Sequence, residues 1–140
     1  MNNLPKNKTI ILFDGECAMC NNYILFVAKH DSDDNFRFLS IQNKKVNELK
    51  KIHSICTENI SSIYIIDNNE IKSKSRAVLK IMSMLKYPYN LLIVFYVIPG
   101  FLRDLIYDLV AKNRYRIFGK VDECSIVKKY TNLIQDKLIE

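Results

Sequence analysis

Residues 9–20 read TIILFDGECAMC, and this stretch decides the fold class. Its first five residues form a short, mostly apolar run of strand-forming side chains, which is typical of a buried central strand. Asp14 and Gly15 interrupt the run, and a helical pattern follows over residues 18–30. One face of that pattern carries Cys20, Tyr23, Ile24 and Val27. The stretch therefore predicts a strand, a turn and a helix that begins beside a C-x-x-C pair.

Strand and helix patterns alternate through the rest of the first 86 residues. We expect further strands at residues 36–41, 62–66 and 71–73, and helices over residues 46–56 and 75–85, the last capped by Ser75. The resulting order, β-α-β-α-β-β-α, places a parallel unit before a hairpin and a helix. This order resembles that of the thioredoxin-like fold, so we predict an α/β protein with a thioredoxin-like core.

A strongly apolar segment follows at residues 91–98, and Pro99 and Gly100 separate it from a second helical pattern. That second pattern places Leu102, Leu105, Ile106, Leu109 and Val110 on one face. The uncharged stretch from residue 87 to 102 has 16 residues, fewer than the ~20 that a membrane-spanning helix needs. We therefore expect a helical hairpin packed on the sheet, rather than membrane contact. In this interpretation residues 1–140 form one domain, with the core at 9–86 and a helical extension at 89–140.

Composition and charge argue against a disordered chain, a nucleic-acid-binding protein and a secreted protein. The chain has 140 residues, of which 49% are hydrophobic and 26% charged, a globular composition. The net charge of +6 comes from scattered lysines, which favours a solvated surface and no nucleic-acid partner. The apolar run at residues 10–13 is too short for a signal peptide, so we expect the cytoplasm. Cysteines there stay reduced unless they are catalytic or bind metal.

Cys17 and Cys20 have the spacing and the position that thiol–disulfide exchange requires. Residues three apart share one face of a helix, so the two sulfurs can form a disulfide. Unpaired N–H groups and the helix dipole at the helix start stabilise a thiolate. We expect Cys17 to be the nucleophile and Cys20 the resolving thiol. Two compatible roles for Asp14 remain open: it accepts the proton of Cys20 during resolution, and it forms a turn through local backbone N–H groups.

Two alternatives to a redox enzyme remain open. Cys17, Cys20, His53 and Cys56 would supply the four ligands of a tetrahedral zinc site in a zinc-stabilised binding module. The second alternative is a redox-inactive interaction domain that docks a partner or a membrane through residues 91–98.

Cys124 lies in a polar stretch, and we interpret it as structural or incidental rather than as a third redox thiol.

Two separated motifs resemble the DCC family of predicted thiol–disulfide oxidoreductases. Residues 14–21, DGECAMCN, are similar to its D-G-x-C-x-x-C-N signature, and residues 98–119 are similar to its C-terminal block. A weaker middle block matches at residues 75–78. The resemblance implies a thioredoxin-like fold and exchange with protein or small-molecule thiols and disulfides, without a cofactor. It implies a site built from Asp14, Cys17 and Cys20.

The chain departs from ordinary thioredoxins in lacking tryptophan, a W-C-G-P-C sequence and a proline at residues 59–62. A substrate groove like that of thioredoxin is therefore not expected.

Three arginines of the C-terminal block, Arg103, Arg114 and Arg116, are candidates for stabilising a thiolate or binding an anion. We favour a structural role for them, in which Arg103 and Asp104 cap the hairpin. Arg114 and Arg116 would then pair with acids such as Asp108. Tyr107 and Tyr115 are expected to pack with their hydroxyls at the surface.

Overall fold

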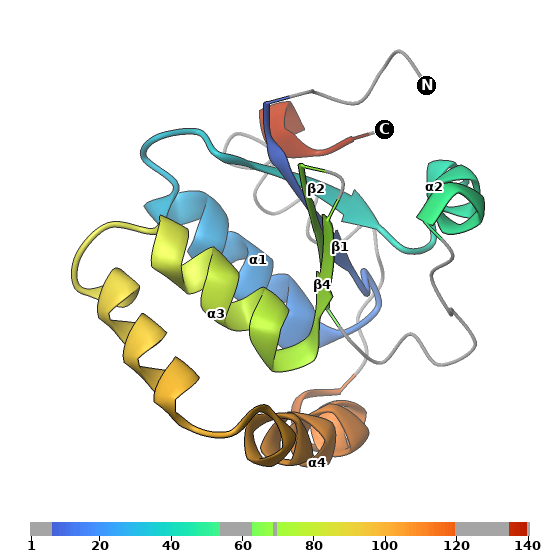
Figure 1. The fold of residues 1–140 in the computed structure, drawn as a ribbon. Helices are drawn as coiled ribbons and strands as arrows, with labels where there is room; N and C mark the ends of the chain where they lie inside the picture. Colours follow the sequence, from blue (N-terminus) through green and yellow to red (C-terminus); the bar gives the residue numbers. More distant parts are fainter. Residues whose placement is uncertain (1–6, 54–62, 69, 120–134, 140) are drawn as a thin grey trace.

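The protein is described by a computed structural model that covers residues 7–53, 63–68, 70–119 and 135–139, without the side chains of residues 50, 52, 53, 118 and 135. A four-stranded sheet lies between helices on both of its faces (Figure 1). In chain order the elements are β1 (Thr9–Phe13), α1 (Ala18–His30), β2 (Phe36–Ser40), α2 (Lys45–His53), β3 (Tyr64–Asp67), β4 (Glu70–Ser73), α3 (Lys74–Met84), the 3₁₀ helix η1 (Tyr89–Val97), α4 (Gly100–Phe118) and the 3₁₀ helix η2 (Gln135–Lys137).

The order of the strands in the sheet is β2-β1-β3-β4. Strands β1 and β2 are parallel, with Phe13 opposite Ser40, whereas β3 is antiparallel to both β1 and β4. This topology confirms the predicted α/β fold with a thioredoxin-like core. The two parallel strands end side by side, so the residues that follow them meet at one edge of the sheet.

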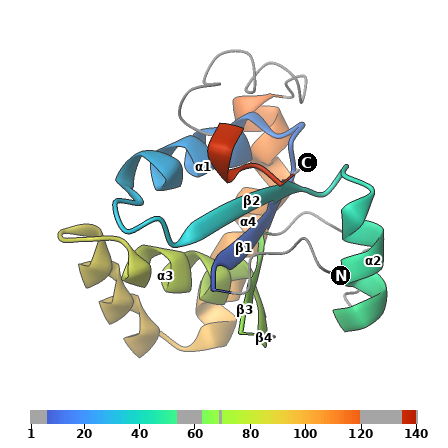
Figure 2. The ribbon, with the colours of Figure 1, turned by 90° about the horizontal axis from the view of Figure 1, so that it is seen from above.

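Strand β1 is buried on both faces, which explains its unbroken apolar run. Ile11 and Phe13 point toward α1 and α3, in a core that also holds Phe36 and Phe38. Ile10 and Leu12 point to the opposite face, where α2 covers them (Figure 2). Each face of the sheet therefore has its own core, and β1 belongs to both.

The extension differs from the prediction in what it packs against. Both η1 and α4 contact α3, and α4 also contacts α1, so the helical hairpin of the extension lies mainly on helices rather than on the sheet. The predicted apolar face of α4 is also turned the other way. Its five residues Leu102, Leu105, Ile106, Leu109 and Val110 are all exposed. Spacing predicts a shared face but not the direction in which that face points.

Helix α3 begins at Lys74, one residue before the range of residues 75–85 that the sequence predicts. Ser73 is its cap residue and makes no side-chain cap hydrogen bond, so the prediction that Ser75 caps the helix is wrong. The hydroxyl of Ser75 instead donates to Asp104 and ties α3 to α4.

Strand β2 receives the last described segment of the chain. Leu138 forms an isolated parallel bridge with Phe38, and the Ile139 N–H donates to the Phe38 carbonyl at 2.9 Å. Lys137 pairs with the buried carboxylate of Asp31. These contacts fix the segment beside β2.

Candidate active site

Cys17 is the N-cap residue of α1, where an extended backbone turns into the helix. Its sulfur accepts a hydrogen bond from the backbone N–H of Cys20 at 3.3 Å. A cap position exposes the sulfur to unpaired N–H groups and to the positive end of the helix dipole. The predicted position of Cys17 at the helix start is therefore confirmed.

The two sulfurs have opposite acidities. Hydrogen bonding from the Cys20 side chain, helped by the Cys20 backbone N–H and by Arg114, lowers the pKa of Cys17 to about 6. The same hydrogen bond, together with burial, raises the pKa of Cys20 above its ordinary value. At neutral pH this arrangement supports one thiolate, on Cys17, and one thiol, on Cys20.

Asp14 lies directly after β1 and is buried. Its Oδ1 accepts hydrogen bonds from the Glu16 N–H at 3.0 Å and from Gln42 Nε2 at 2.9 Å. The first of these bonds shows that Asp14 forms the local turn that leads to Cys17. The second fixes its carboxylate from the neighbouring strand, because Gln42 follows β2.

The other oxygen of Asp14 faces α4. Arg114 Nη2 lies 2.9 Å from Asp14 Oδ2, and the relative exposure of both side chains is 5%. The Tyr115 hydroxyl donates to the same oxygen, and Arg114 Nη1 lies 3.7 Å from the sulfur of Cys20. A buried ion pair thus connects the turn before Cys17 with the sulfur of Cys20 and with α4.

Two further residues support this geometry, and neither is predicted from the sequence as a site residue. The Asn21 side-chain amide donates to the Gly15 carbonyl at 2.8 Å, which ties the turn to α1. Gln42 Oε1 accepts from the Gly15 N–H at 3.2 Å. A signal for Gln42 was present, since side chains that follow adjacent parallel strands meet at one edge of the sheet.

Comparison with known proteins identifies a protein family whose model covers this site. Residues 11–120 match the family model described as DCC1-like thiol-disulfide oxidoreductase. The chain belongs to this family. It is 35% identical over 117 residues to the uncharacterised protein YuxK of Bacillus subtilis, covering 84% of this chain and 85% of YuxK. It is 38% identical over 120 residues to a chloroplastic DCC family protein of Arabidopsis thaliana, covering 85% of this chain and 70% of the relative. No solved structure matched the chain.

The DCC1-like match contains every residue of the cluster around Cys17 and Cys20, including Arg114 and Tyr115. The resemblance drawn from the two motifs is confirmed, and the protein is a thiol–disulfide oxidoreductase by family. The family's C-terminal block supplies the buried cation of the site, because Arg114 lies in α4.

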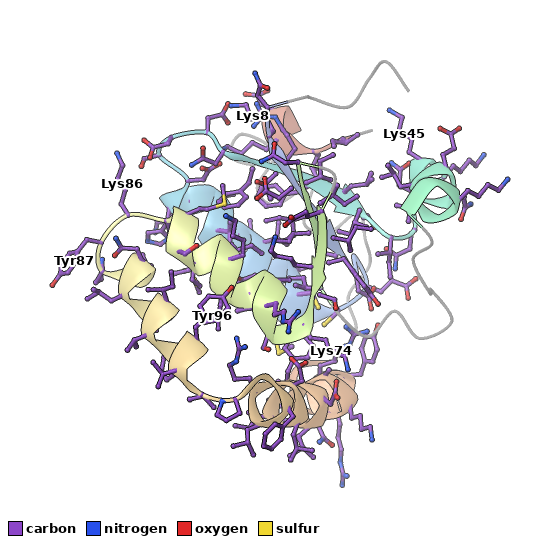
Figure 3. The ribbon with its side chains drawn as sticks, viewed as in Figure 1. Lys8, Lys45, Lys74, Lys86, Tyr87 and Tyr96 are labelled. Carbon is purple, nitrogen blue, oxygen red and sulfur yellow. The ribbon has the colours of Figure 1, made fainter. Side chains whose placement is uncertain are left out.

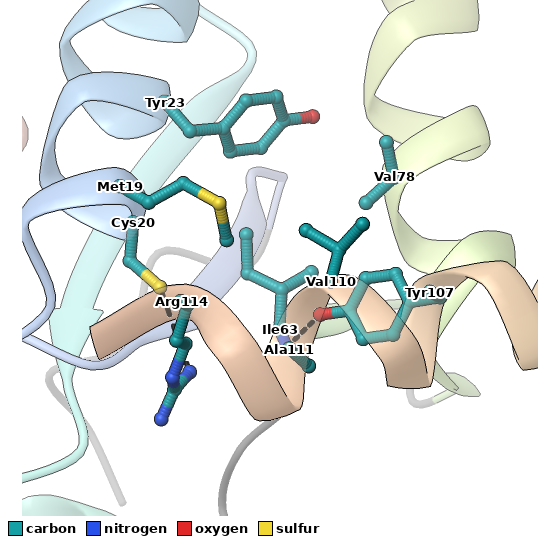
Figure 4. Close-up of a pocket in the computed structure, with 9 residues that line it drawn as sticks. All are labelled: Met19, Cys20, Tyr23, Ile63, Val78, Tyr107, Val110, Ala111 and Arg114. Atoms are coloured by element: carbon teal, nitrogen blue, oxygen red, sulfur yellow. Dashed lines mark hydrogen bonds between the residues drawn. The ribbon is translucent and has the colours of Figure 1, made fainter. Parts of the chain in front are cut away.

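A cavity of about 160 Å³ lies beside Cys20, between α1, α3 and α4 (Figure 4). Its walls are mostly apolar, and it also contacts the side chains of Tyr23, Tyr107 and Arg114. The Tyr107 hydroxyl accepts the Ile63 N–H at 2.8 Å. The Tyr23 hydroxyl is buried without a hydrogen-bond partner among the described residues. Burial raises the pKa of both phenols, that of Tyr107 to about 12, so they are neutral donors at physiological pH.

The expected pairing of the arginines is wrong. Arg114 pairs with Asp14, whereas Asp108 pairs with Lys74 at 3.1 Å. Arg103 places its guanidinium 4.9 Å from the centre of the Tyr96 ring. Among the ion pairs of the described residues, none involves Arg116.

The expectation that the hydroxyls of Tyr107 and Tyr115 lie at the surface is also wrong. Both tyrosines make inward hydrogen bonds, to the Ile63 N–H and to Asp14 respectively. Each meets a buried polar group that would otherwise lack that partner.

The proposed zinc ligands are only partly described. Cys56 and the side chain of His53 lie outside the described residues. Cys124, which is not one of the proposed ligands, lies outside them too. Within the described part of the chain, no group of three or more metal-ligating side chains comes together. No helix among the residues that can be placed is long and apolar enough to cross a membrane.

Proposed function

We propose that this DCC1-like protein exchanges disulfides through Cys17 as the nucleophile and Cys20 as the resolving thiol. The observation that carries the proposal is the position of the Cys17 sulfur at the helix N-cap, where it accepts the Cys20 N–H. A thiolate there has the low pKa that attack at neutral pH needs, about 6.

The reaction proceeds in two balanced steps. The Cys17 thiolate attacks one sulfur of a substrate disulfide, forms a mixed disulfide and releases the other substrate sulfur as a thiolate. Cys20 then gives its proton to the thiolate released in the first step and attacks the Cys17 sulfur, which releases the second substrate thiolate. The products are a Cys17–Cys20 disulfide and a substrate reduced by two electrons, and an external dithiol restores the enzyme.

Arg114 stabilises the second step. Cys20 is buried with a raised pKa, so its thiolate needs a cation as the proton leaves. Arg114 Nη1 lies 3.7 Å from its sulfur, and Asp14 holds the other nitrogen of the guanidinium. In this proposal Asp14 is a positioning residue that acts through Arg114.

The substrate brings an apolar group beside its disulfide. The 160 Å³ cavity adjoins Cys20 and is lined by Met19, Ile63, Val78 and Val110 among others. A side chain of moderate size in that cavity would hold the substrate sulfur close to the C-x-x-C pair. Cys17 itself is 0% exposed, so binding must move neighbouring groups before attack.

Trapping the mixed disulfide tests the assignment. Cys20→Ser is expected to accumulate a covalent adduct with a peptide disulfide, because attack by Cys17 proceeds and resolution does not. Cys17→Ser, the matched control, is expected to form none. Intact mass spectrometry measures both. An adduct of equal yield in the two variants, or in neither while both remain folded, would contradict the assignment.

We place this exchange in the cytoplasm, with protein or small-molecule thiols and disulfides as partners. Cysteines in that compartment stay reduced unless they are catalytic or bind metal, so we expect Cys17 and Cys20 to rest as thiols between turnovers. Fractionation of cells followed by alkylation of free thiols tests the location and the resting redox state together.

A further inference from the structure

Helix α4 has its polar and apolar faces reversed relative to a helix on a water-exposed surface. A surface helix normally turns its apolar stripe toward the core and its charges toward water. Here Asp104, Asp108 and Arg114 face α3 and the active site through hydrogen bonds and ion pairs. The exposed face carries Phe101, Leu102, Leu105, Ile106, Leu109, Val110 and Ile117.

The 3₁₀ helix η1 continues this apolar surface. Leu91, Ile93, Val94 and Phe95 are exposed, and Val97 is 84% exposed. In Figure 3, η1 and α4 lie along one side of the molecule, with Tyr87 pointing away from its body. Every large apolar side chain that is exposed in the described part of the chain lies between residues 87 and 117. We call the exposed residues of η1 and α4 together the η1–α4 face.

A surface of this extent is unusual for a protein surrounded by water. Single exposed apolar residues are ordinary, whereas a contiguous patch over two elements marks a binding surface. Tyr89 and Tyr96 hold η1 against the rest of the protein. The Tyr89 hydroxyl lies 3.2 Å from His30 Nε2, and its ring packs on the rings of Phe26 and His30. The Tyr96 hydroxyl lies near the Arg76 carbonyl, and its ring lies under Arg103. Contacts with α3 therefore hold η1 and α4 in place on their inner side, whereas the side chains of the η1–α4 face are exposed.

The charged residues of the η1–α4 face have a single sign. The sequence of η1 contains no charged residue, and both acids of α4 are engaged by α3: Asp104 accepts from Ser75, and the partly exposed Asp108 pairs with Lys74. The exposed charged residues of α4 are Lys112 and Arg116. An apolar face that carries cations in the C-terminal part of α4 matches the acyl boundary and the headgroups of an anionic lipid surface.

We propose that the η1–α4 face lies on an anionic phospholipid bilayer, with its apolar side chains in the interface and Lys112 and Arg116 at the headgroups. The protein lies on the membrane without crossing it, since no described helix is long and apolar enough to cross. The redox site lies behind α4, because Arg114 reaches Asp14 and Cys20 from the opposite side of the same helix.

A second copy of the chain is a poorer occupant for this face. Self-association through a shared face would bring Lys112 and Arg116 of each copy into the interface, while Asp104 and Asp108 are already engaged by Ser75 and Lys74 of α3. The net charge of +6 adds repulsion between copies and attraction to anionic lipid.

Vesicle co-sedimentation tests the proposal on the full chain. Binding is expected to vesicles of mixed phosphatidylglycerol and phosphatidylcholine, to fall with added salt, and to be much weaker with phosphatidylcholine alone. Phe101→Asp is expected to weaken binding roughly tenfold or more, because it places a charge where an aromatic ring enters the interface. Asn47→Asp, on the exposed surface of α2, makes the same charge change and is expected to bind like the unaltered protein.

Disulfide exchange in solution separates this test from that of the redox site. Phe101 is 73% exposed and far in sequence from the cysteines, so Phe101→Asp is expected to keep the fold and the exchange activity. Absence of binding to anionic vesicles, or equal binding by both aspartate variants, would overturn the proposal. A dimer that Phe101→Asp disperses, without vesicle binding, would overturn it too and assign the face to a second copy.

Discussion

At the scale of single residues, the site is organised by one buried ion pair rather than by the cysteines alone. Asp14 and Arg114 are separated by 100 positions in the chain and meet at 2.9 Å. Gln42, Tyr115 and the Glu16 N–H also donate hydrogen bonds to the carboxylate. A carboxylate so close to a thiolate would oppose its formation if it were unpaired, and Arg114 compensates for that charge.

Breaking this ion pair is expected to be costly. Arg114→Met leaves the buried Asp14 carboxylate without its cation, so we expect the free energy of unfolding to fall by about 3–5 kcal/mol. The pKa of Cys17 should rise as well, since Arg114 helps to lower it. Urea denaturation measures the first effect, and the pH dependence of alkylation at Cys17 measures the second.

The ion pair between Lys74 and Asp108 is the matched control, because it joins α3 to α4 but is about 40% exposed. Lys74→Met should cost only about 0–1 kcal/mol and leave the pKa of Cys17 unchanged. Similar losses for Lys74→Met and Arg114→Met would show that the burial of the Asp14–Arg114 pair has no energetic consequence.

The sequence predicts the local arrangement of the site better than the long-range contacts within it. Cys17, Cys20 and the turn at Asp14 follow from a strand, a turn and a helix within 22 residues. The partner of Asp14 did not follow, since Arg103, Arg114 and Arg116 carry the same charge and the sequence does not distinguish them as ion-pair partners. Only the path of α4 over α1 and α3 brings Arg114, rather than Arg116, to the site.

At the scale of elements, α4 is the part that closes the site. It attaches to α3 through Ser75 and Asp104, and to the residue before β3 through Tyr107. Periodicity predicted that α4 has an apolar face. It could not tell whether that face meets the protein or an external surface, because both environments select the same side chains.

Removing the Tyr107 hydroxyl tests the attachment of α4. Tyr107→Phe leaves the Ile63 N–H without its partner, and we expect a loss of about 1–3 kcal/mol in the free energy of unfolding. Hydrogen exchange of the Ile63 amide should become faster. Tyr96→Phe is the control, because the Tyr96 hydroxyl is exposed and lies 3.5 Å from its acceptor. An unchanged Ile63 exchange rate in Tyr107→Phe would contradict a role for this hydrogen bond.

At the scale of the whole molecule, the acidity of Cys17 makes the stability of the reduced protein depend on pH. The pKa of Cys17 is about 6 in the folded protein against an ordinary value of 9.0. Between these two pH values the unfolded chain binds the proton and the folded chain does not. The thiolate therefore stabilises the reduced fold increasingly as pH rises through this window, and the contribution is lost as pH falls through 6.

The reduced protein is expected to gain stability from pH 6 to pH 9, with a total on the order of 2–4 kcal/mol from Cys17. Cys17→Ser lacks the titrating sulfur and should not show this gain. Urea denaturation of both reduced proteins across the window measures the difference. Parallel stability curves for the two proteins would contradict a thiolate at Cys17.

The segment at residues 135–139 has a consequence for the molecule's behaviour in a crowded solution. Strand β2 stands at the margin of the sheet, where its unpaired carbonyls would offer a template to any extended peptide. Leu138 and Ile139 occupy that position, and Lys137 is fastened to Asp31 beside it. Residues 137–139 thus shield this margin of the sheet from strand addition by another chain.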